Sequence, residues 1–295
     1  MLLWQTVGVS ADYSYDIVFL ALARNCADTI PGFVQGMERL RQAGIRVAAV
    51  VGENGSEDDT RELLEDAAAA TGVVHVVDTS FMSGAASRLE RMALGRQFVA
   101  RFAKDMLLPA RSICVIDVDE PFLENLQPDV LLSALQRVMD GDVFAVSATS
   151  RPTYYDLLAY EDGERSFADL GERIRNAQHN PFAYYSFFRK FVYPEQRRLT
   201  SDTDTLCRSA FNGLCLYSAG TYALGTYIPE NGPWICEHIT FNRSLASATG
   251  LQMVVDRALV VPMPSEHGRL TLVPFMWQRM RKLPEMFAMR LGKSG

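Results

Sequence analysis

The sequence predicts an α/β fold in which a mostly parallel sheet is flanked by helices. Two observations predict it: apolar runs of strand length alternate with segments of helical periodicity through the first 150 residues, and turn residues separate them. A chain of 295 residues, 48% of them apolar and 22% charged, can bury the core that such a fold needs. In alternating folds the crossovers are right-handed, and ligands bind beyond the carboxyl ends of the strands. The residues that follow each strand are therefore expected to carry the function.

The predicted elements follow one another along the first half of the chain. Thr29 is placed to cap the first helix and Gly44 to end it, while Ser56 is placed to cap the second helix and Gly72 follows its end. We expect strands at residues 15–23, 45–52, 73–79, 113–116 and 142–150, and helices at 29–44, 56–72 and 85–107.

Composition excludes several classes of protein. The formal charge of −6 argues against nucleic acid as the main partner, because binding to a phosphate backbone usually needs a basic face. The five cysteines are scattered without a C-x-x-C pair, which favours free thiols in a reducing compartment over a disulfide framework or a zinc site. The N-terminal residues lack a signal-peptide pattern, and no apolar run reaches the length of a membrane span. We therefore expect a cytoplasmic protein.

Two aspartates follow the fourth predicted strand. Asp117 and Asp119 flank Val118 directly after a buried apolar run. Two carboxylates at this spacing can reach one hard cation where the chain turns, and Mg²⁺ and Mn²⁺ commonly bridge such carboxylates to a diphosphate. Alternatively, Asp119 begins a turn before Pro121 and Asp117 caps a nearby helix.

Other charged side chains lie at the ends of predicted elements. Glu53 ends the second strand, where an acidic group suits ribose hydroxyls or a base N–H. Arg24, after the first strand, can pair with Glu53 or face a nucleotide. Arg88 and Arg91 share one face of the third helix, with Arg96 only roughly aligned, and arginine forks suit phosphate oxygens. The alternative for these arginines is a solvated basic face.

The second half of the chain holds a further acidic motif. Glu237 and His238 follow the turn "PENGPW", so both side chains can point into a cleft from the start of a helix, although Glu237 can instead cap that helix. His267, in "PSEHGR", is a second candidate metal ligand.

Taken in order, seven motifs resemble those of a known enzyme family. They are "LARN", "ENGSEDDT", "RLERMALGRQF", "DVDE", "RPTYYD", "SAFNGLCLY" and "CEHITFN", and the similarity spans roughly residues 15 to 262. The order is similar to that of GT-A glycosyltransferases, specifically the family of the fungal capsule α-1,3-mannosyltransferases and their bacterial relatives.

The resemblance implies a GT-A fold and the transfer of a hexose, with mannose as the candidate, from a GDP- or UDP-sugar to a hydroxyl acceptor, with Mn²⁺ or Mg²⁺. It implies that Asp119 and Glu237 are catalytic, with Glu237 as the base if the reaction inverts stereochemistry. If the reaction retains stereochemistry, His238 or His267 completes the metal site instead. The implied ligands are Arg24 and Glu53 at the nucleotide, Arg88 and Arg91 at the diphosphate, Asp117 and Asp119 at the metal, and Asn212 and Gly213 in the sugar pocket.

We expect three segments. Residues 1–150 form the half that binds the nucleotide sugar, residues 151–268 form the acceptor and catalytic half of the same domain, and residues 269–295 form a basic amphipathic tail. Such a tail can lie on an anionic membrane surface, or it can pack against the body of the protein or a second subunit. The acceptor is accordingly expected to be a growing or lipid-linked polysaccharide, with peripheral contact at the inner membrane surface.

Two other functions compete with this interpretation. A non-catalytic scaffold would keep the nucleotide-sugar cleft without turnover. A phosphatase of the haloacid dehalogenase type also uses D-x-D after an apolar strand, but its pair usually follows the first strand, whereas three predicted strands precede Asp117 here.

Overall fold

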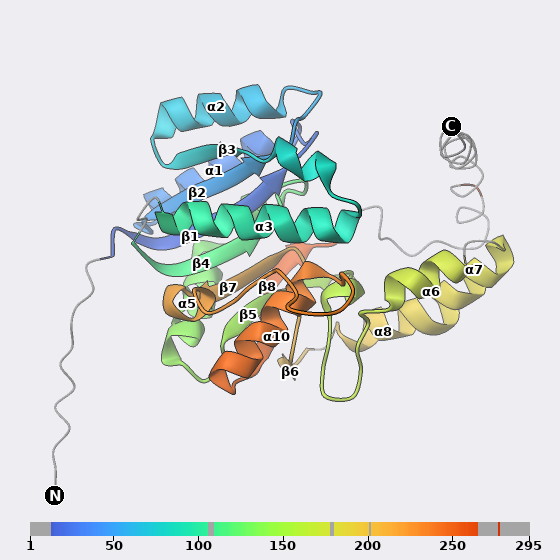
Figure 1. Cartoon of the computed structure of the whole chain (residues 1–295). Coiled ribbons are helices and arrows are strands. Elements are labelled where there is room, and N and C mark those ends of the chain that lie inside the picture. Colours follow the sequence, from blue (N-terminus) through green and yellow to red (C-terminus); the bar gives the residue numbers. More distant parts are fainter. Residues whose placement is uncertain (1–12, 106–108, 178–179, 201, 265–276, 278–295) are drawn as a thin grey trace, which may run out of the picture.

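The computed structural model describes residues 13–105, 109–177, 180–200, 202–264 and 277 (Figure 1). Within them, eight strands form one sheet in the order β3-β2-β1-β4-β7-β5-β8-β6. Strands β3, β2, β1 and β4 run parallel to one another, and β5 runs parallel to β8. Strand β7 runs antiparallel between β4 and β5, and β6 pairs antiparallel with β8. The predicted α/β class is confirmed: the chain forms one mixed sheet with a parallel half, and helices pack against the sheet.

The strands begin and end close to where their apolar runs predict. The first predicted strand is found without a shift, and the others move by a few residues. Three further strands, β6, β7 and β8, lie in the second half of the chain. The bounds are β1 Tyr15–Ala23, β2 Val47–Glu53, β3 Val74–Asp78, β4 Ala110–Ile116, β5 Ala145–Arg151, β6 Thr205–Cys207, β7 Leu214–Ser218 and β8 Met253–Pro262.

The helices of the first half also follow their predicted segments, but one predicted cap is wrong. Ser56 does not cap α2, whose N-cap residue is Asp59. Thr29 is the N-cap residue of α1 as predicted, but its side chain makes no capping hydrogen bond, because its hydroxyl faces the carbonyls of Cys26 and Val118. The α-helices are α1 Ile30–Gln42, α2 Thr60–Thr71, α3 Arg88–Asp105, α4 Phe122–Asn125, α5 Pro128–Asp140, α6 Leu170–Ala177, α7 Pro181–Phe187, α8 Tyr193–Arg198, α9 Ala219–Tyr222 and α10 Glu237–Thr249.

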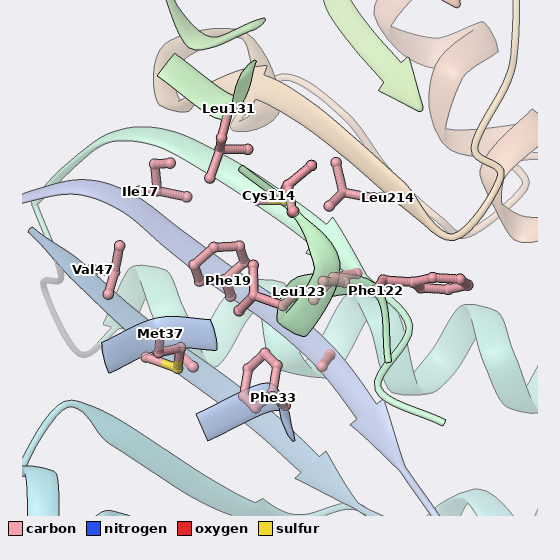
Figure 2. Close-up of a cluster of buried hydrophobic side chains, with 14 of the residues drawn as sticks. Ile17, Phe19, Phe33, Met37, Val47, Cys114, Phe122, Leu123, Leu131 and Leu214 are labelled. Carbon is pink, nitrogen blue, oxygen red and sulfur yellow. The ribbon is translucent and has the colours of Figure 1, made fainter. Parts of the chain in front are cut away.

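One face of the sheet packs against α1, α2, α4 and α5. Alternate residues of the strands point to this face, as the two-residue period of a strand requires. Figure 2 shows Phe19 of β1 among Phe33 and Met37 of α1, with Leu123 of α4 beside them. The packing is close, since a Cβ at Gly36 would lie 2.8 Å from the Leu123 side chain.

The opposite face packs against α3, α9, α10 and the segment that follows β5. Val18 and Leu20 of β1 lie in this second core with Val99 of α3 and Phe241 of α10. Both halves of the sequence therefore contribute to one sheet and to both of its cores. The division near residue 150 stays a prediction.

Helices α6, α7 and α8 stand away from the sheet (Figure 1), and the π-helical turn η3 (Phe188–Val192) joins α7 to α8. Two short 3-10 turns complete the described elements, η1 (Ser80–Gly84) and η2 (Leu157–Ala159). In the described parts of the chain, no helix combines the length and apolar character that crossing a membrane needs. All five cysteines are free thiols, as predicted.

Candidate active site

The candidate site lies at the carboxyl edge of the sheet, where β4 ends. Asp117 is the first residue after β4, and its backbone N–H donates to the carbonyl of Gly213, 3.0 Å away, at the start of β7. The antiparallel pairing of β4 with β7 makes this bond, since it brings Leu214 opposite Ile116. The turn before β7 therefore fixes the backbone position of Asp117.

A buried arginine holds the Asp117 side chain. Nη2 of Arg96 lies 2.6 Å from Oδ1 of Asp117, and the Arg96 side chain is 4% exposed. Burial raises the pKa of Asp117 to about 7; Arg96 opposes this, while the charges of Asp119 and Asp156 add to it. Burial acts against the charge of Arg96, but the Asp117 and Glu237 carboxylates hold its pKa above the ordinary value. The site thus holds more negative charge than Arg96 neutralises.

Arg96 forms the ion pair with Asp117, although the sequence pattern favoured Arg88 and Arg91 as the functional arginines of this helix. A signal was present, because Arg96 lies between Ala93 and Val99 in steps of three residues, and both neighbours are buried. A single arginine within a buried helical stripe needs a buried partner. The sequence does not name that partner, which is far along the chain.

Glu237 also faces Arg96, and Asp156 lies near Glu237. Glu237 opens α10, and its Oε1 lies 4.0 Å from Nε of Arg96, with the side chain 8% exposed. Asp156 follows β5 by five residues; burial and the charge of Glu237 raise its pKa to about 6, against backbone hydrogen bonds and the charge of Arg88. The structure therefore places Asp117 and Glu237 at Arg96, with Asp156 near Glu237. The sequence singled out Asp117 and Glu237, and Asp156 was not among the site residues predicted from it.

Asn212 and the residue after it hold the segments that carry Asp156 and Asp117. Oδ1 of Asn212 accepts hydrogen bonds from the backbone N–H groups of Tyr155 at 3.1 Å and Asp156 at 3.2 Å. Asn212 is fully buried with a φ of 53°, and Gly213 follows with a φ of 83°. One left-handed turn thereby fixes the backbone of Asp156 through the Asn212 side chain and that of Asp117 through the Gly213 carbonyl.

The Asn212 side chain is expected to contribute about 2 kcal/mol to the free energy of unfolding, because Asn212→Gly strips two buried N–H groups of their acceptor. Glycine tolerates the positive φ, so backbone strain does not enter. Urea unfolding measures the change. Asn25→Gly is the matched control, since Asn25 is an exposed asparagine with a φ of 51°, and it is expected to cost less than about 1 kcal/mol. Equal costs at the two positions would contradict the bridging role.

His238 is buried beside this group. Its ring stacks on that of Phe211 with centroids 3.6 Å apart, and its Nε2 lies 3.4 Å from Oε1 of Glu237. Burial and the charge of Arg96 lower the pKa of His238 well below its ordinary value, so the ring is neutral. Within the described ranges, no three His, Cys, Asp or Glu side chains form a group that could hold a metal ion. His238 as a metal ligand stays a prediction, and His267 lies outside the described residues.

The predicted nucleotide ligands lie at the ends of the neighbouring strands. Glu53 ends β2, is fully buried, accepts from the backbone N–H of Ser56 at 2.6 Å, and forms an ion pair with Arg61. Burial acts to raise the pKa of Glu53, but Ser56 and Arg61 hold it below the ordinary value. Arg24 is exposed one residue beyond β1. The carboxylate of Glu53 thus holds the turn that follows β2, and a contact of Glu53 with a nucleotide stays a prediction.

The remaining predicted residues lie at the open side of the site. Asp119 is exposed two residues after Asp117, and Arg88 is exposed at the first turn of α3. The charge of Arg88 acts on Asp156, so the two lie near one another. Arg91 is half-buried on the same helix.

Comparisons with known proteins add a set of solved structures of similar fold. No family model and no curated protein sequence matches the chain. A mannosyltransferase from Pyrobaculum calidifontis in complex with GDP-Man and Mn²⁺ is 14% identical, with a TM-score of 0.48, over 86% of this chain and 59% of that one. Mannosyl-3-phosphoglycerate synthase from Rubrobacter xylanophilus is 16% identical, with a TM-score of 0.44, over 95% of this chain and 75% of that one.

A third similar structure is glucosyl-3-phosphoglycerate synthase from Mycobacterium tuberculosis in complex with Mn²⁺, uridine diphosphate and glucosyl-3-phosphoglycerate. It is 15% identical, with a TM-score of 0.43, over 94% of this chain and 80% of that one. The chain spans less than two thirds of the length of the mannosyltransferase. The roles of residues in this chain are therefore argued from its own side chains.

Proposed function

We propose that this protein is a glycosyltransferase that moves a sugar from a nucleoside-diphosphate donor to a hydroxyl acceptor with the help of a divalent cation. The observation that supports it is the pairing of Asp117 and Glu237 with the buried Arg96 at the carboxyl edge of the sheet, with Asp156 near Glu237. Ligands of α/β sheets bind at that edge. A cluster of carboxylates with one buried counter-charge is a site that can take up a cation.

The residues present fit a divalent cation. Asp117 is 32% exposed at its side chain and Asp119 is exposed, so both offer carboxylate oxygens to the open side of the site. Mg²⁺ typically takes one or two protein carboxylates and fills its other positions with water and phosphate oxygens. Two carboxylates therefore suffice where a diphosphate is the substrate. When bound, the cation supplies positive charge to the leaving diphosphate.

The chain's own residues would then divide the remaining work. Arg88 and Arg91 supply guanidinium groups for the diphosphate oxygens, the contact for which arginine forks are suited. Arg96 orients Asp117 and opposes the rise in its pKa that burial causes. The turn at Asn212 and Gly213 fixes the backbone of Asp117 and Asp156 and borders the proposed sugar pocket.

Glu237 is the proposed proton acceptor if the transfer inverts stereochemistry. Its carboxylate is held at the first position of α10, and the neutral ring of His238 lies beside it. A positioned base of this kind accepts the proton of the acceptor hydroxyl as the new bond forms. If the transfer is retaining, the base is dispensable and Glu237 instead balances the charge of Arg96.

Mannose is the proposed sugar and a lipid-linked or growing polysaccharide the proposed acceptor, on the sequence resemblance alone. The amphipathic tail at residues 269–295, which supported a membrane-associated acceptor, lies outside the described residues apart from Trp277.

A donor panel tests the proposal. GDP-mannose, UDP-glucose, UDP-galactose and UDP-N-acetylglucosamine are added singly with Mn²⁺ or with chelator, and the melting temperature is measured. A donor at a hundred times its dissociation constant stabilises the protein by about 2.7 kcal/mol, which for a chain of this size is a rise of roughly 4 °C. We expect one donor to give this rise with Mn²⁺ only, and Asp119→Ala to abolish it.

Two outcomes would count against the proposal. If no donor raises the melting temperature under any condition, or if Asp119→Ala responds like the wild type, the aspartates are turn residues. If the donor binds but no nucleoside diphosphate is released with or without acceptors, the protein is the non-catalytic scaffold.

A further inference from the structure

Helices α6, α7 and α8, together with η3, form a helical arm over residues 170–198, of which 178 and 179 are not described. Its sequence carries six basic residues against two acidic ones, a net charge of +4, so the rest of the chain carries −10 of the total of −6. The basic residues are Arg173, Arg175, Arg189, Lys190, Arg197 and Arg198. The arm is thus a basic element on an acidic protein.

The outer face of the arm carries two of these basic residues together with aromatic side chains. Phe182, at the beginning of α7, is 66% exposed. Tyr185 and Arg189 follow it by three and seven residues, and Nη1 of Arg189 donates to the Tyr185 hydroxyl at 3.1 Å, so the three lie along one face. Lys190 is exposed next to Arg189. This face therefore offers an exposed aromatic ring and, two helical turns along, two exposed cations.

The inner face of the arm is a small core of its own. The rings of Phe187 and Phe191 stack with centroids 5.4 Å apart, and the guanidinium of Arg173 lies 3.8 Å from the centre of the Phe191 ring. Cation–π and ring contacts of this kind hold α6 against the helix formed by α7 and η3. The arm can therefore present its outer face as a fixed surface.

The base of the arm is bonded to the segment that carries Asp156. Nε2 of Gln196, in α8, donates to the carbonyl of Tyr155 at 3.4 Å, and the hydroxyl of Thr200 accepts from the N–H of Tyr154 at 2.7 Å. The arm therefore extends from the edge of the sheet where the candidate site lies.

We propose that the outer face of the helical arm docks on the anionic surface of a phospholipid bilayer. Cations near such a surface gain from its negative potential, while an aromatic ring next to them enters the interface between headgroups and acyl chains. A soluble anion would be met by the basic residues alone, whereas a bilayer also takes up the Phe182 ring. The proposal needs no catalytic activity, and the residues that carry it belong to the arm and not to the segment 269–295.

Vesicle co-sedimentation with the full chain tests it. The vesicles are phosphatidylcholine mixed with phosphatidylglycerol, or phosphatidylcholine alone, in rising salt. Each cation near an anionic surface strengthens binding about fivefold, so the double variant R189E/K190E is expected to bind at least roughly 20-fold more weakly. Phe182→Ser is expected to lose roughly tenfold, because a buried aromatic ring returns to water.

A matched double variant controls for net charge. R101E/K104E also reverses one arginine and one lysine, at exposed positions on α3, and is expected to bind vesicles like the wild type. Circular dichroism and melting temperature report whether each variant is folded. The residues 269–295 are intact in every variant, so a loss confined to the arm variants belongs to the arm.

Three outcomes would overturn the proposal. The wild type fails to bind anionic vesicles, or R189E/K190E and Phe182→Ser bind them as tightly as the wild type does. The third outcome is that the arm variants lose binding to dextran sulfate, a soluble anionic polysaccharide, while their binding to vesicles is unchanged. That result would make the arm a surface for anionic saccharide instead.

Discussion

Replacing Arg96 with methionine is expected to lower the free energy of unfolding by about 3 kcal/mol or more. The substitution keeps most of the side-chain volume but removes the counter-charge of two carboxylates, Asp117 at 2.6 Å and Glu237 at 4.0 Å. A buried charge left without its partner costs more than the pair contributes when it is intact. Urea unfolding, with the midpoint and slope both fitted, measures the change.

The control for this variant is Arg101→Met on the same helix. Arg101 is exposed, so the same change of side chain there is expected to cost less than about 0.5 kcal/mol. A loss of less than about 1 kcal/mol at Arg96 would contradict the buried ion pair.

A double-mutant cycle assigns the effect to the aspartate. Asp117→Asn removes the charge that Arg96 faces, so Arg96→Met is expected to cost less in that background, with a coupling of about 1 kcal/mol or more. The donor shift described above is expected to vanish in Arg96→Met, since Asp117 loses the contact that orients its carboxylate. Additive costs in the cycle would mean that Arg96 stabilises the fold without positioning Asp117.

Replacing Gly213 with alanine is expected to cost about 3 kcal/mol or more, from two sources. The φ of 83° is unfavourable for any residue with a Cβ. In addition, the new Cβ would lie 2.5 Å from the Tyr155 hydroxyl oxygen and 2.7 Å from Cζ of Phe122, well inside contact distance. Phe122 is 1% exposed, so its ring has little room to move.

Gly44→Ala separates the two sources. Gly44 has the same φ of 83°, and a Cβ built there meets nothing within 4 Å. It is expected to cost about 1 to 2 kcal/mol, the backbone cost alone. The difference between the two variants is the packing cost at Gly213, and both costs come from urea unfolding. If Gly213→Ala cost no more than Gly44→Ala, the turn would not be packed against Phe122 and Tyr155.

Gly213→Ala also reports on the site, because the Gly213 carbonyl accepts from the N–H of Asp117. A displaced turn moves that acceptor, so the metal-dependent donor shift is expected to weaken in Gly213→Ala and to stay unchanged in Gly44→Ala. This pair of variants therefore links the packing of the turn to the proposed binding of the donor.

Local pattern determined most of the parallel half of the sheet. The apolar run at residues 15–23 matches β1, and Gly72 follows α2 in the left-handed conformation that its position predicts. The end of β4 places Asp117 at the sheet edge as expected. These features depend on neighbours within a few residues, and such information is present in any one stretch of the chain.

Tertiary structure alone decided which of the charged residues meet. Arg96 and Asp117 are 21 residues apart, and Glu237 comes from the far end of the chain. They meet because β7 inserts antiparallel beside β4 and α10 packs against α3. Likewise, Glu53 suits a ligand by its position, yet its carboxylate is engaged by Arg61. The sequence by itself determined the strands and the aspartates at their ends. Only the folded sheet decided their partners, because pairing between distant segments depends on strand order and register, which periodicity within one segment does not encode.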